Sequence, residues 1–593
     1  MERSASPAAT SGLPIDEALP ALRAALARTS SVVLQAPPGA GKSTVAPLAL
    51  LDEPWARGKR LVLLEPRRLA ARAVAQRMAA TLAEPIGRTI GWRMRFDTRV
   101  SRDTRIEVVT EGVLTRMLQS DPALEGTGLV IFDEFHERSL QGDLGLALAL
   151  DAQAVVAPDL KLLVMSATLD AEAIAAWLGA SARVTANGRS FPVETRFIGR
   201  GPPLLPSIGA ARGESPERLT AHAVERALRE AAGDVLVFLP GAAEIRRVEA
   251  LLTASLADDQ TLRVLPLYGD LSTADQDAAL VPARPGHRKV ILSTNIAETS
   301  LTVEGIRIVV DSGLVRRAVF DPATGMSRLE TRRISRASAE QRRGRAGRLD
   351  AGVCYRLWSE EAQRSLAPYS PAEIVEADLA PLALELAAWG VLAAEMASPR
   401  SGSAAEPLSS AQAHRAPSPS GLRWLDPPSA AMLASARDLL LRLGALDHAS
   451  RITPHGRQMA ALAVHPRLAH MLLEARRLGL ANTAARLAAL LSERDGLRAE
   501  PARSSGVAHG AAPTSRDAAD ADIRSRLAQL AEPRGAGRAG NAAQRIERLA
   551  RSLIRQLASA GAPPGGAGST ERMASSERAA AAERAAAQGA AFV

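Results

Sequence analysis

A lysine in a glycine-rich turn is the first group in this sequence whose surroundings predict chemistry. The turn reads APPGAGKST, Ala36 to Thr44, and directly follows SVVLQ, a run typical of a buried strand. Closely spaced glycines let backbone N–H groups point at a triphosphate, where Lys42 would reach the β- and γ-phosphates and the Ser43 hydroxyl would ligate Mg²⁺. The chain has only four lysines, and one of them stands at this position. A Gly/Pro turn with a solvated lysine is therefore the weaker interpretation, although Ala36 replaces the usual first glycine of GxxxxGK[ST].

A second candidate group is acidic and follows another apolar run. The run LVIF ends in DEFHERS, so Asp133 and Glu134 stand at the carboxyl end of a predicted buried strand. A carboxylate at that place can hold Mg²⁺, directly or through water, and its neighbour can accept a proton from an attacking water. An ordinary acidic loop explains DE alone equally well, but not its pairing with the lysine turn. A lone histidine in such a loop, His136, is more often a satisfied loop residue than a metal ligand.

Two series of strand-like runs provide the framework for these residues. The first comprises Ser31–Gln35, Leu61–Leu64, Ile106–Val109, Leu129–Phe132 and Leu162–Met165. The second comprises Val193–Ile198, Val235–Leu239, Val264–Leu267, Val290–Leu292 and Ile306–Val310. Amphipathic helical stretches separate the runs, which predicts βαβ units and two mostly parallel α/β lobes that divide near Asn187–Pro192.

Composition narrows the class of protein. The 593 residues carry 73 Lys+Arg against 64 Asp+Glu, a net charge of +9, and 69 of the basic residues are arginine. A GC-rich genome is the preferred explanation of the arginine excess. Recognition of phosphate groups by guanidinium is the second explanation. The single cysteine, Cys354, excludes an internal disulfide framework and a multi-cysteine metal site. Because we find neither a membrane-length apolar run nor a signal pattern in MERSASPAAT, we expect a soluble, cytoplasmic protein without a membrane partner.

Helical Leu/Ala periodicity replaces the strand signals after residue 358. Within 359–500, the segment Met396–Ser420 is rich in Ser, Pro and Ala, and we expect it to be a disordered insertion. The Arg/Ala/Gly-rich segment 501–593 holds 13 arginines against eight acidic residues, and we expect it to be a low-complexity tail or a truncated C-terminal domain. Much of the basic excess lies there, so net charge is weak evidence for a polyanionic partner.

Eight short motifs in order make the chain resemble a superfamily 2 helicase of the DEAH/RHA type, in its DEFH variant. They span some 310 residues and read GAGKST, EPRRLAARA, TEG, DEFH, SAT, VFLPG, STNIAETSLT and QRRGRAGR. DEFHERSL together with LRWLDPPSA is most similar to the bacterial HrpB-type ATP-dependent helicases. The resemblance implies two tandem RecA-like P-loop lobes, then a mostly helical winged-helix and helical-bundle region. The implied domains are a leader 1–13, lobe one 14–190, lobe two 191–358, the helical region 359–500 and the tail 501–593.

The resemblance also implies roles for individual residues. ATP–Mg²⁺ would be cradled by Gly39, Ala40, Gly41, Lys42, Ser43 and Thr44, with the metal on Ser43 and Asp133. Catalysis would involve Lys42, Asp133, Glu134, His136, Gln341, Arg345 and Arg348, of which Gln341 helps to order the water and the two arginines act as fingers from lobe two. A basic nucleic-acid patch is the alternative interpretation of QRRGRAGR. Coupling of nucleotide state to the nucleic-acid groove would use His136, Ser166 and Thr168.

Single-stranded RNA or DNA is the partner that the resemblance implies. Its backbone would be contacted by Arg67, Arg68, Thr110, Gly241 and Thr294. The segment Val315–Ser335 has strand-like ends around a Pro/Gly turn and matches either the family's strand-separating hairpin or a plain hairpin edge. We therefore expect an ATP-dependent translocase or helicase that moves 3′-to-5′. The alternative is a nucleic-acid-binding or remodelling protein with a degenerate motor, which Ala36 and the tail favour.

Overall fold

The computed structural model describes most of the two lobes and the helices that follow them. The described residues are 11–95, 97–167, 171–179, 182–188, 191–205, 215–269, 271–298, 303–392, 421–492, 523–531 and 538–559. They form two compact units, the first of which holds both lobes, runs to Ala377 and includes Leu422–Pro427. The expected insertion at Met396–Ser420 lies outside the described residues.

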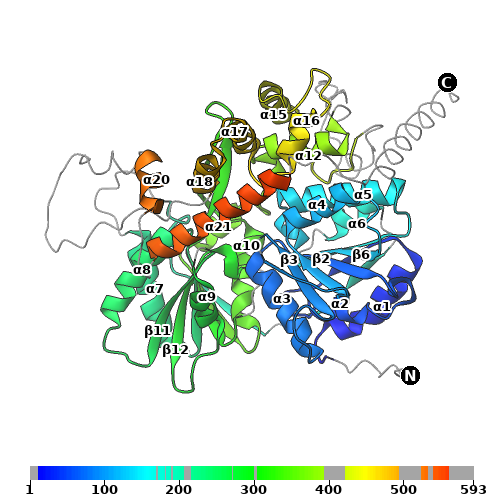
Figure 1. The fold of residues 1–593 in the computed structure, drawn as a ribbon. Coiled ribbons are helices and arrows are strands. Elements are labelled where there is room, and N and C mark those ends of the chain that lie inside the picture. The colour runs from blue at the N-terminus through cyan, green and yellow to red at the C-terminus, as the bar shows by residue number, and fades with distance from the viewer. Residues whose placement is uncertain are drawn as a thin grey trace, which may run out of the picture. The chain divides into compact units, whose positions relative to one another are not determined.

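Lobe one is an eight-stranded sheet with helices on both faces. Its strand order is β4-β3-β5-β2-β6-β7-β1-β8, and only the β3–β4 pair is antiparallel. The strands are β1 Ser31–Gln35, β2 Arg60–Leu64, β3 Ile90–Met94, β4 Asp97–Arg99, β5 Ile106–Val109, β6 Thr127–Phe132, β7 Lys161–Ser166 and β8 Arg183–Thr185. The helices are α1 Ile15–Arg28, α2 Ala46–Ala49, α3 Arg68–Thr81, α4 Glu111–Ser120, α5 Leu140–Val155 and α6 Ala171–Leu178. Figure 1 shows α4 and α5 on one side of the strands and α2 and α3 on the other.

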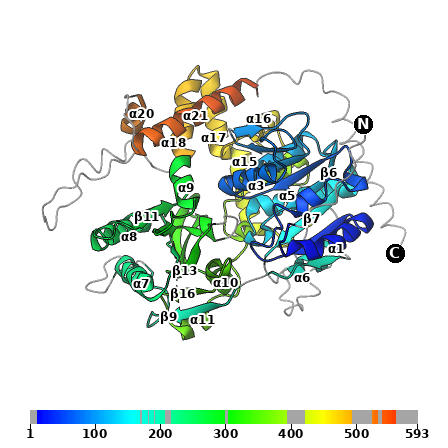
Figure 2. The same ribbon diagram turned by 90° about the horizontal axis from the view of Figure 1, so that it is seen from below.

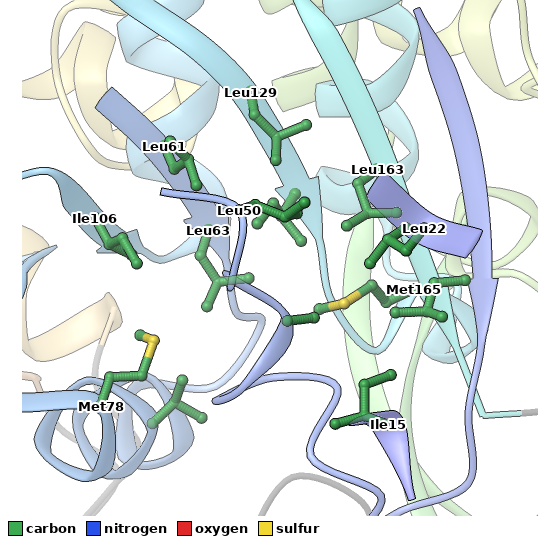
Figure 3. Close-up of a cluster of buried hydrophobic side chains, with 14 of the residues drawn as sticks. Ile15, Leu22, Leu50, Leu61, Leu63, Met78, Ile106, Leu129, Leu163 and Met165 are labelled. Atoms are coloured by element: carbon green, nitrogen blue, oxygen red, sulfur yellow. The ribbon is translucent and has the colours of Figure 1, made fainter. Parts of the chain in front are cut away.

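Alternate side chains of the central strands fix these helices to the sheet. Leu61 and Leu63 of β2, with Leu163 and Met165 of β7, are fully buried against α1 and α3 (Figure 3). Burial of each such side chain stabilises the fold by about 1.5–3 kcal/mol, so this cluster holds the strand ends that carry the motifs.

Lobe two is a six-stranded parallel sheet of order β11-β12-β10-β13-β16-β9. Its strands are β9 Val193–Phe197, β10 Asp234–Phe238, β11 Leu262–Leu267, β12 Arg288–Ser293, β13 Ile306–Asp311 and β16 Gly352–Arg356. Its helices are α7 Pro216–Glu230, α8 Ala242–Ser255, α9 Thr273–Leu280, α10 Arg336–Gly344 and α11 Glu360–Ser365. Val235 and Val237 face α7 and α8, which lie side by side in Figures 1 and 2, whereas Leu236 and Phe238 face the α9 side. The predicted fold of two tandem parallel α/β lobes is confirmed.

The segment between β13 and α10 is a two-stranded hairpin. Strands β14 Leu314–Asp321 and β15 Met326–Arg333 pair antiparallel over their whole length. The hairpin is tied to Glu376, near the end of the first unit. Arg332, next to the base, pairs with the Glu376 carboxylate at 2.6 Å, and Phe320, next to the turn, donates its N–H to the Glu376 carbonyl. The hairpin conformation agrees with the sequence prediction, and its role stays a prediction.

The second unit is helical. It contains α12 Ala380–Trp389, α15 Ala430–Arg442, α16 Pro454–Ala460, α17 Pro466–Arg477, α18 Ala481–Ser492, α20 Ile523–Ala531 and α21 Arg538–Ser559. Part of the segment expected to be a low-complexity tail is thus a helix, α21, that packs on α18. Its buried face is Ala542, Ile546, Leu549, Leu553 and Leu557, a helical spacing that the surrounding alanine and arginine conceal. None of the described helices is long and apolar enough to cross a bilayer.

Candidate nucleotide site and its link to a nucleic-acid groove

The glycine-rich turn follows β1 and bends at two left-handed glycines. Gly39 has φ +86° and Gly41 has φ +96°, conformations that residues with a Cβ rarely adopt. No heavy atom lies within 4 Å of where a Gly39 Cβ would stand, so the backbone there faces open space. Ala36 is fully buried at the end of β1, and its N–H donates to the Ser166 carbonyl at 3.0 Å. Its backbone is not left-handed, so alanine fits where the usual pattern has glycine.

Lys42 joins this turn to the acidic residues after β6. Its Nζ lies 3.0 Å from Asp133 Oδ1 and 2.7 Å from Glu134 Oε1, and all three side chains are nearly inaccessible to solvent. Strand β7 separates β1 from β6 in the sheet, and the carboxyl ends of these parallel strands meet at one edge. The topology therefore brings together residues that are 91 and 92 positions apart.

This cluster perturbs the pKa of each member. Burial alone would raise the pKa of Glu134, but the Lys42 ammonium outweighs burial and lowers it to about 2. Burial raises the pKa of Asp133, although Lys42 opposes the shift. Burial disfavours the charged form of Lys42, yet the two carboxylates raise its pKa above the usual value. Glu134 is thus held ionised while Lys42 contacts it.

The donor set next to Lys42 fits a hard cation such as Mg²⁺. Ser43 lies close enough to Asp133 to counteract the rise in the pKa of its carboxyl, which places a hydroxyl and a carboxylate together. Asp133 Oδ2 is buried without a hydrogen-bond partner, an arrangement that calls for a ligand because burying an unpaired acceptor is costly. Oxygen donors of this kind are what Mg²⁺ prefers.

His136 bridges the acidic motif to the end of β7. Its Nδ1 accepts the Ala167 N–H at 3.3 Å, and its Nε2 lies 3.4 Å from Glu134 Oε2 without forming a hydrogen bond. Burial lowers the pKa of His136, so the ring is neutral with its proton on Nε2. Ser166 is fully buried directly before this contact, and Thr168 lies outside the described residues. Sequence reasoning named Ser166 and Thr168 but missed the Ala167 N–H, because a backbone donor leaves no mark on residue type.

Helix α10 and the turn after it, η4 (Arg345–Gly347), carry the arginine motif from lobe two. Arg345 is buried, donates to the Glu298 carbonyl at 2.8 Å and interacts with Glu134 of lobe one. Burial lowers the pKa of Arg345, and the nearby Arg348 lowers it further. Burial likewise lowers the pKa of Arg348 to about 10. Two neighbouring guanidinium groups, of which Arg345 is buried, favour binding of an anion.

Arg342 is a residue of this motif that sequence reasoning passed over. Its side chain is 1% exposed, bonds Glu298 Oε2 and Asp311 Oδ1 at 2.9 Å each, and lies over the Phe238 ring. It therefore fixes α10 to the sheet of lobe two. Nothing in QRRGRAGR distinguishes this bracing arginine from Arg345 or Arg348, because burial depends on tertiary packing.

A cavity of about 810 Å³ lies between the phosphate loop and the arginine motif. It is lined from lobe one by Gly39 and Ala40, and from lobe two by Gln341, Arg345 and Arg348. The Gln341 Nε2 is buried without a hydrogen-bond partner. The structure thus brings the expected phosphate loop and the expected fingers to one space of the size that small-molecule sites have.

The expected nucleic-acid residues lie at the carboxyl ends of strands in both lobes. Arg67 follows β2, pairs with Glu137 at 3.0 Å and donates to the Asn295 carbonyl, beside Thr294. Arg68 is exposed at the start of α3, and Thr110 precedes α4. Gly241 precedes α8, where an added Cβ would approach Arg316 Nη1 to 2.6 Å. Arg67 is thus engaged within the protein here, rather than presented to solvent.

Two α/β lobes built on parallel strands, with a phosphate loop on one lobe and a buried arginine motif on the other, define the motor class of P-loop helicases. Family models agree: residues 16–176 match the DEAD/DEAH box helicase family, and residues 218–350 match the helicase conserved C-terminal domain. The chain belongs to the DEAH/RHA helicases.

Known members are similar over most of the chain. The ATP-dependent RNA helicase HrpB of Escherichia coli strain K12 is 48% identical over 483 residues, which cover 82% of this chain and 55% of HrpB. The pre-mRNA-splicing factor ATP-dependent RNA helicase prp22 of Schizosaccharomyces pombe is 35% identical over 81% of this chain and 39% of its own length. The crystal structure of the E. coli DEAH/RHA helicase HrpB superposes with a TM-score of 0.73 at 42% identity, covering 93% of this chain and 63% of that one. The chain therefore spans from about two fifths to just under two thirds of the length of these relatives.

Proposed function

We propose that this chain is a nucleic-acid-stimulated ATPase that works as an ATP-dependent helicase. The observation that carries the proposal is the shared cavity, which faces the Lys42 loop on one side and Arg345 and Arg348 on the other. A site divided in this way acts only when both lobes contribute, so nucleotide turnover can be coupled to lobe movement.

In this proposal, the phosphate loop holds ATP through backbone N–H groups and Lys42. The cradle consists of Gly39, Ala40, Gly41, Lys42, Ser43 and Thr44. Ser43 and Asp133 would hold Mg²⁺, which supplies positive charge to the phosphate oxygens when bound. A triphosphate offers Lys42 a new anionic partner, so Lys42 would leave the carboxylates that it contacts here.

The departure of Lys42 would make Glu134 a base. Its pKa is low in this structure mainly because the ammonium lies 2.7 Å away, and burial alone would raise it. With Lys42 on the phosphates, Glu134 accepts the proton of a water that Gln341 helps to orient. Arg345 and Arg348 stabilise the charge that develops on the transferred group, a contribution of about 10³–10⁵ in rate in other NTPases.

Two contacts within the protein would couple this chemistry to a single strand bound in the proposed groove. His136 connects Glu134 to the Ala167 N–H, and Arg67 connects lobe one to Asn295 in lobe two. Backbone contacts would come from Arg67, Arg68, Thr110, Gly241 and Thr294, so little sequence preference is expected. We propose RNA as the strand because the relatives are named RNA helicases. Membership of the family further supports 3′-to-5′ movement and a cytoplasmic location.

The alternative is a binding or remodelling protein with a degenerate motor. Ala36, which favoured that alternative, fits its buried position at the end of β1 without strain. The two functions are separated by unwinding of labelled duplexes with a 3′ or a 5′ overhang, in RNA and in DNA, with and without ATP. We expect ATP-dependent unwinding of the 3′-overhang RNA duplex. Binding without unwinding of any duplex would favour the alternative.

A further inference from the structure

Two histidines and a glutamate lie together on the helical unit, apart from the nucleotide site. His455 stands in the first turn of α16, and His470 and Glu474 lie one turn apart on α17. His455 Nε2 is 2.9 Å from His470 Nδ1, and one ligand atom from each of His455, His470 and Glu474 lies within 4.8 Å of the other two. Within the part of the chain that the structure describes, this is the one triad of histidine, cysteine or carboxylate residues arranged closely enough to share a metal ion.

The donor atoms suit a transition metal. Two ligand nitrogens on a tetrahedral zinc at about 2.0–2.1 Å from the ion would stand roughly 3.3 Å apart, close to the separation seen here. Two imidazoles and a carboxylate favour zinc-class ions over Mg²⁺ or Ca²⁺, which prefer oxygen ligands alone. All three side chains are half-buried, so an ion can reach them while part of its surroundings is already fixed.

We propose that His455, His470 and Glu474 form a zinc-class metal site that joins α16 to α17. The ion would replace the proton now shared by the two rings, with water completing its coordination. Binding to two helices at once would stabilise the native arrangement of the helical unit, because the unfolded chain does not hold the three ligands together.

Another histidine of the same unit shows what a purely structural role looks like. His465 accepts the Arg467 N–H at its Nδ1, at 3.2 Å, and its Nε2 lies 3.0 Å from Asp378 Oδ2. Both of its ring nitrogens are therefore used by the protein. The His455–His470 contact instead turns one nitrogen of each ring toward the other and toward Glu474.

Arg477 competes for the third ligand. Its Nη1 lies 3.1 Å from Glu474 Oε2, and the Arg477 side chain is largely exposed while that of Glu474 is half-buried. A partly exposed pair of this kind is worth about 0–1 kcal/mol, so an ion can displace it. Removing Arg477 would free Glu474 and strengthen binding of the metal.

Zinc binding by the full chain tests the proposal. Calorimetric titration with ZnCl₂, in excess Mg²⁺ and after removal of any polyhistidine tag, should show one site in the wild-type protein. His455→Asn and His470→Asn should weaken it at least about tenfold, because even groups that only support metal ligands contribute about 10–100-fold. Arg477→Ala should tighten binding, whereas His465→Asn should leave the affinity unchanged. Co²⁺ in place of zinc should give the visible absorption of a tetrahedral site in wild type.

Other outcomes of the zinc titrations would contradict the proposed metal site. Absence of zinc binding in wild type, or an affinity that His455→Asn and His470→Asn leave unchanged, would show that the two rings form only a hydrogen-bonded pair. An unchanged affinity in Arg477→Ala would remove Glu474 from the ligand set. The nucleotide site lies in the other unit, so ATP hydrolysis by these variants reports separately on the proposed function.

Discussion

Glu134 changes its environment in the proposed reaction, because Lys42 leaves it for the phosphates. In this structure its carboxylate contacts Lys42 at 2.7 Å, and its backbone has φ +49°, a conformation that non-glycine residues seldom adopt. Strain at a buried residue of this kind is typical of functional sites, because the surrounding structure must enforce it. A general base held in a low-pKa state by a lysine is expected to become active only once that lysine binds phosphate.

Glu134→Gln should therefore abolish turnover while preserving ATP binding. The amide cannot accept a proton, and we expect kcat to fall by about 10²–10⁴, the usual contribution of general base catalysis. Single-turnover hydrolysis and binding of a fluorescent ATP analogue measure the two properties separately. Glu137→Gln is the control on the same loop, because Glu137 pairs with Arg67 and not with Lys42. Near wild-type hydrolysis in Glu134→Gln would assign the base to another group.

Residue types in the lysine turn and the acidic motif predicted which side chains lie close together, but not which atoms contact one another. That Lys42 and Asp133 stand at one edge follows from parallel strands whose carboxyl ends coincide. That Lys42 contacts both carboxylates, and that the Ala167 N–H binds His136, depends on packing within a few ångströms. Arg342 was passed over for the same reason.

At the scale of the element, α10 is a rigid support for the groups that enter the cavity. Ser335 caps its N-terminus by accepting the Ser338 N–H, and Arg342 fixes it to Asp311 and Glu298. The helix and the turn after it present Gln341 and Arg345. The position of the proposed arginine fingers thus depends on the buried ion pairs of Arg342.

Arg342→Ala should destabilise the chain by about 3–5 kcal/mol, because it leaves two carboxylates without their buried cation. Arg343→Ala, at the next position, is the matched control. Its side chain is 39% exposed and pairs with a half-exposed Glu340, so about 0–1 kcal/mol is expected. Urea unfolding of both variants measures the difference. Equal effects would show that Arg342 does not brace α10.

Glu111, at the start of α4, predicts a pH dependence of stability. Burial raises the pKa of its carboxyl to about 8, with Glu137, Glu373 and Asp143 adding to the shift and Ser139 opposing it. A carboxyl with a raised folded-state pKa contributes stability below its unfolded pKa of 4.5, and this contribution is lost as the pH rises toward 8.

The free energy of unfolding of wild type, relative to Glu111→Gln, should therefore fall by up to about 1.4 kcal/mol per pH unit between these values. Urea midpoints at pH 6 and pH 8.5 test this, with the exposed Glu17→Gln as control. A difference between wild type and Glu111→Gln that does not change with pH would mean that Glu111 is ionised throughout.

Elements with strong apolar runs were predicted well from sequence, and weakly apolar ones were not. The five predicted strands of each lobe are present, with ends displaced by a residue or two. The strands missed in the two sheets are β3, β4, β8 and β16. Strands β4 and β8 are only three residues long, and β3 and β16 carry glycine and arginine among their apolar residues. The helix after the phosphate loop, α2, spans only Ala46–Ala49 and has a proline at its second position.

At the scale of the whole molecule, the described structure unites two lobes in one compact unit around a divided site. Arg345 of lobe two interacts with Glu134 of lobe one, and Arg67 of lobe one donates to Asn295 of lobe two. A strand bound across both lobes would favour their closed arrangement, so nucleic acid should accelerate hydrolysis. Family membership could be predicted from motif order, whereas the choice of strand and the proposed metal site of the helical unit could not.

The central claim is that Lys42 serves ATP hydrolysis that nucleic acid stimulates. Steady-state phosphate release, with and without single-stranded RNA and DNA, should be compared between wild type, Lys42→Ala and Lys59→Ala. Lys59 precedes β2 at the opposite edge of the sheet, so its variant should behave as wild type. We predict stimulated hydrolysis in wild type and Lys59→Ala, and its loss in Lys42→Ala. Equal hydrolysis in wild type and Lys42→Ala, or none in either, would contradict the account.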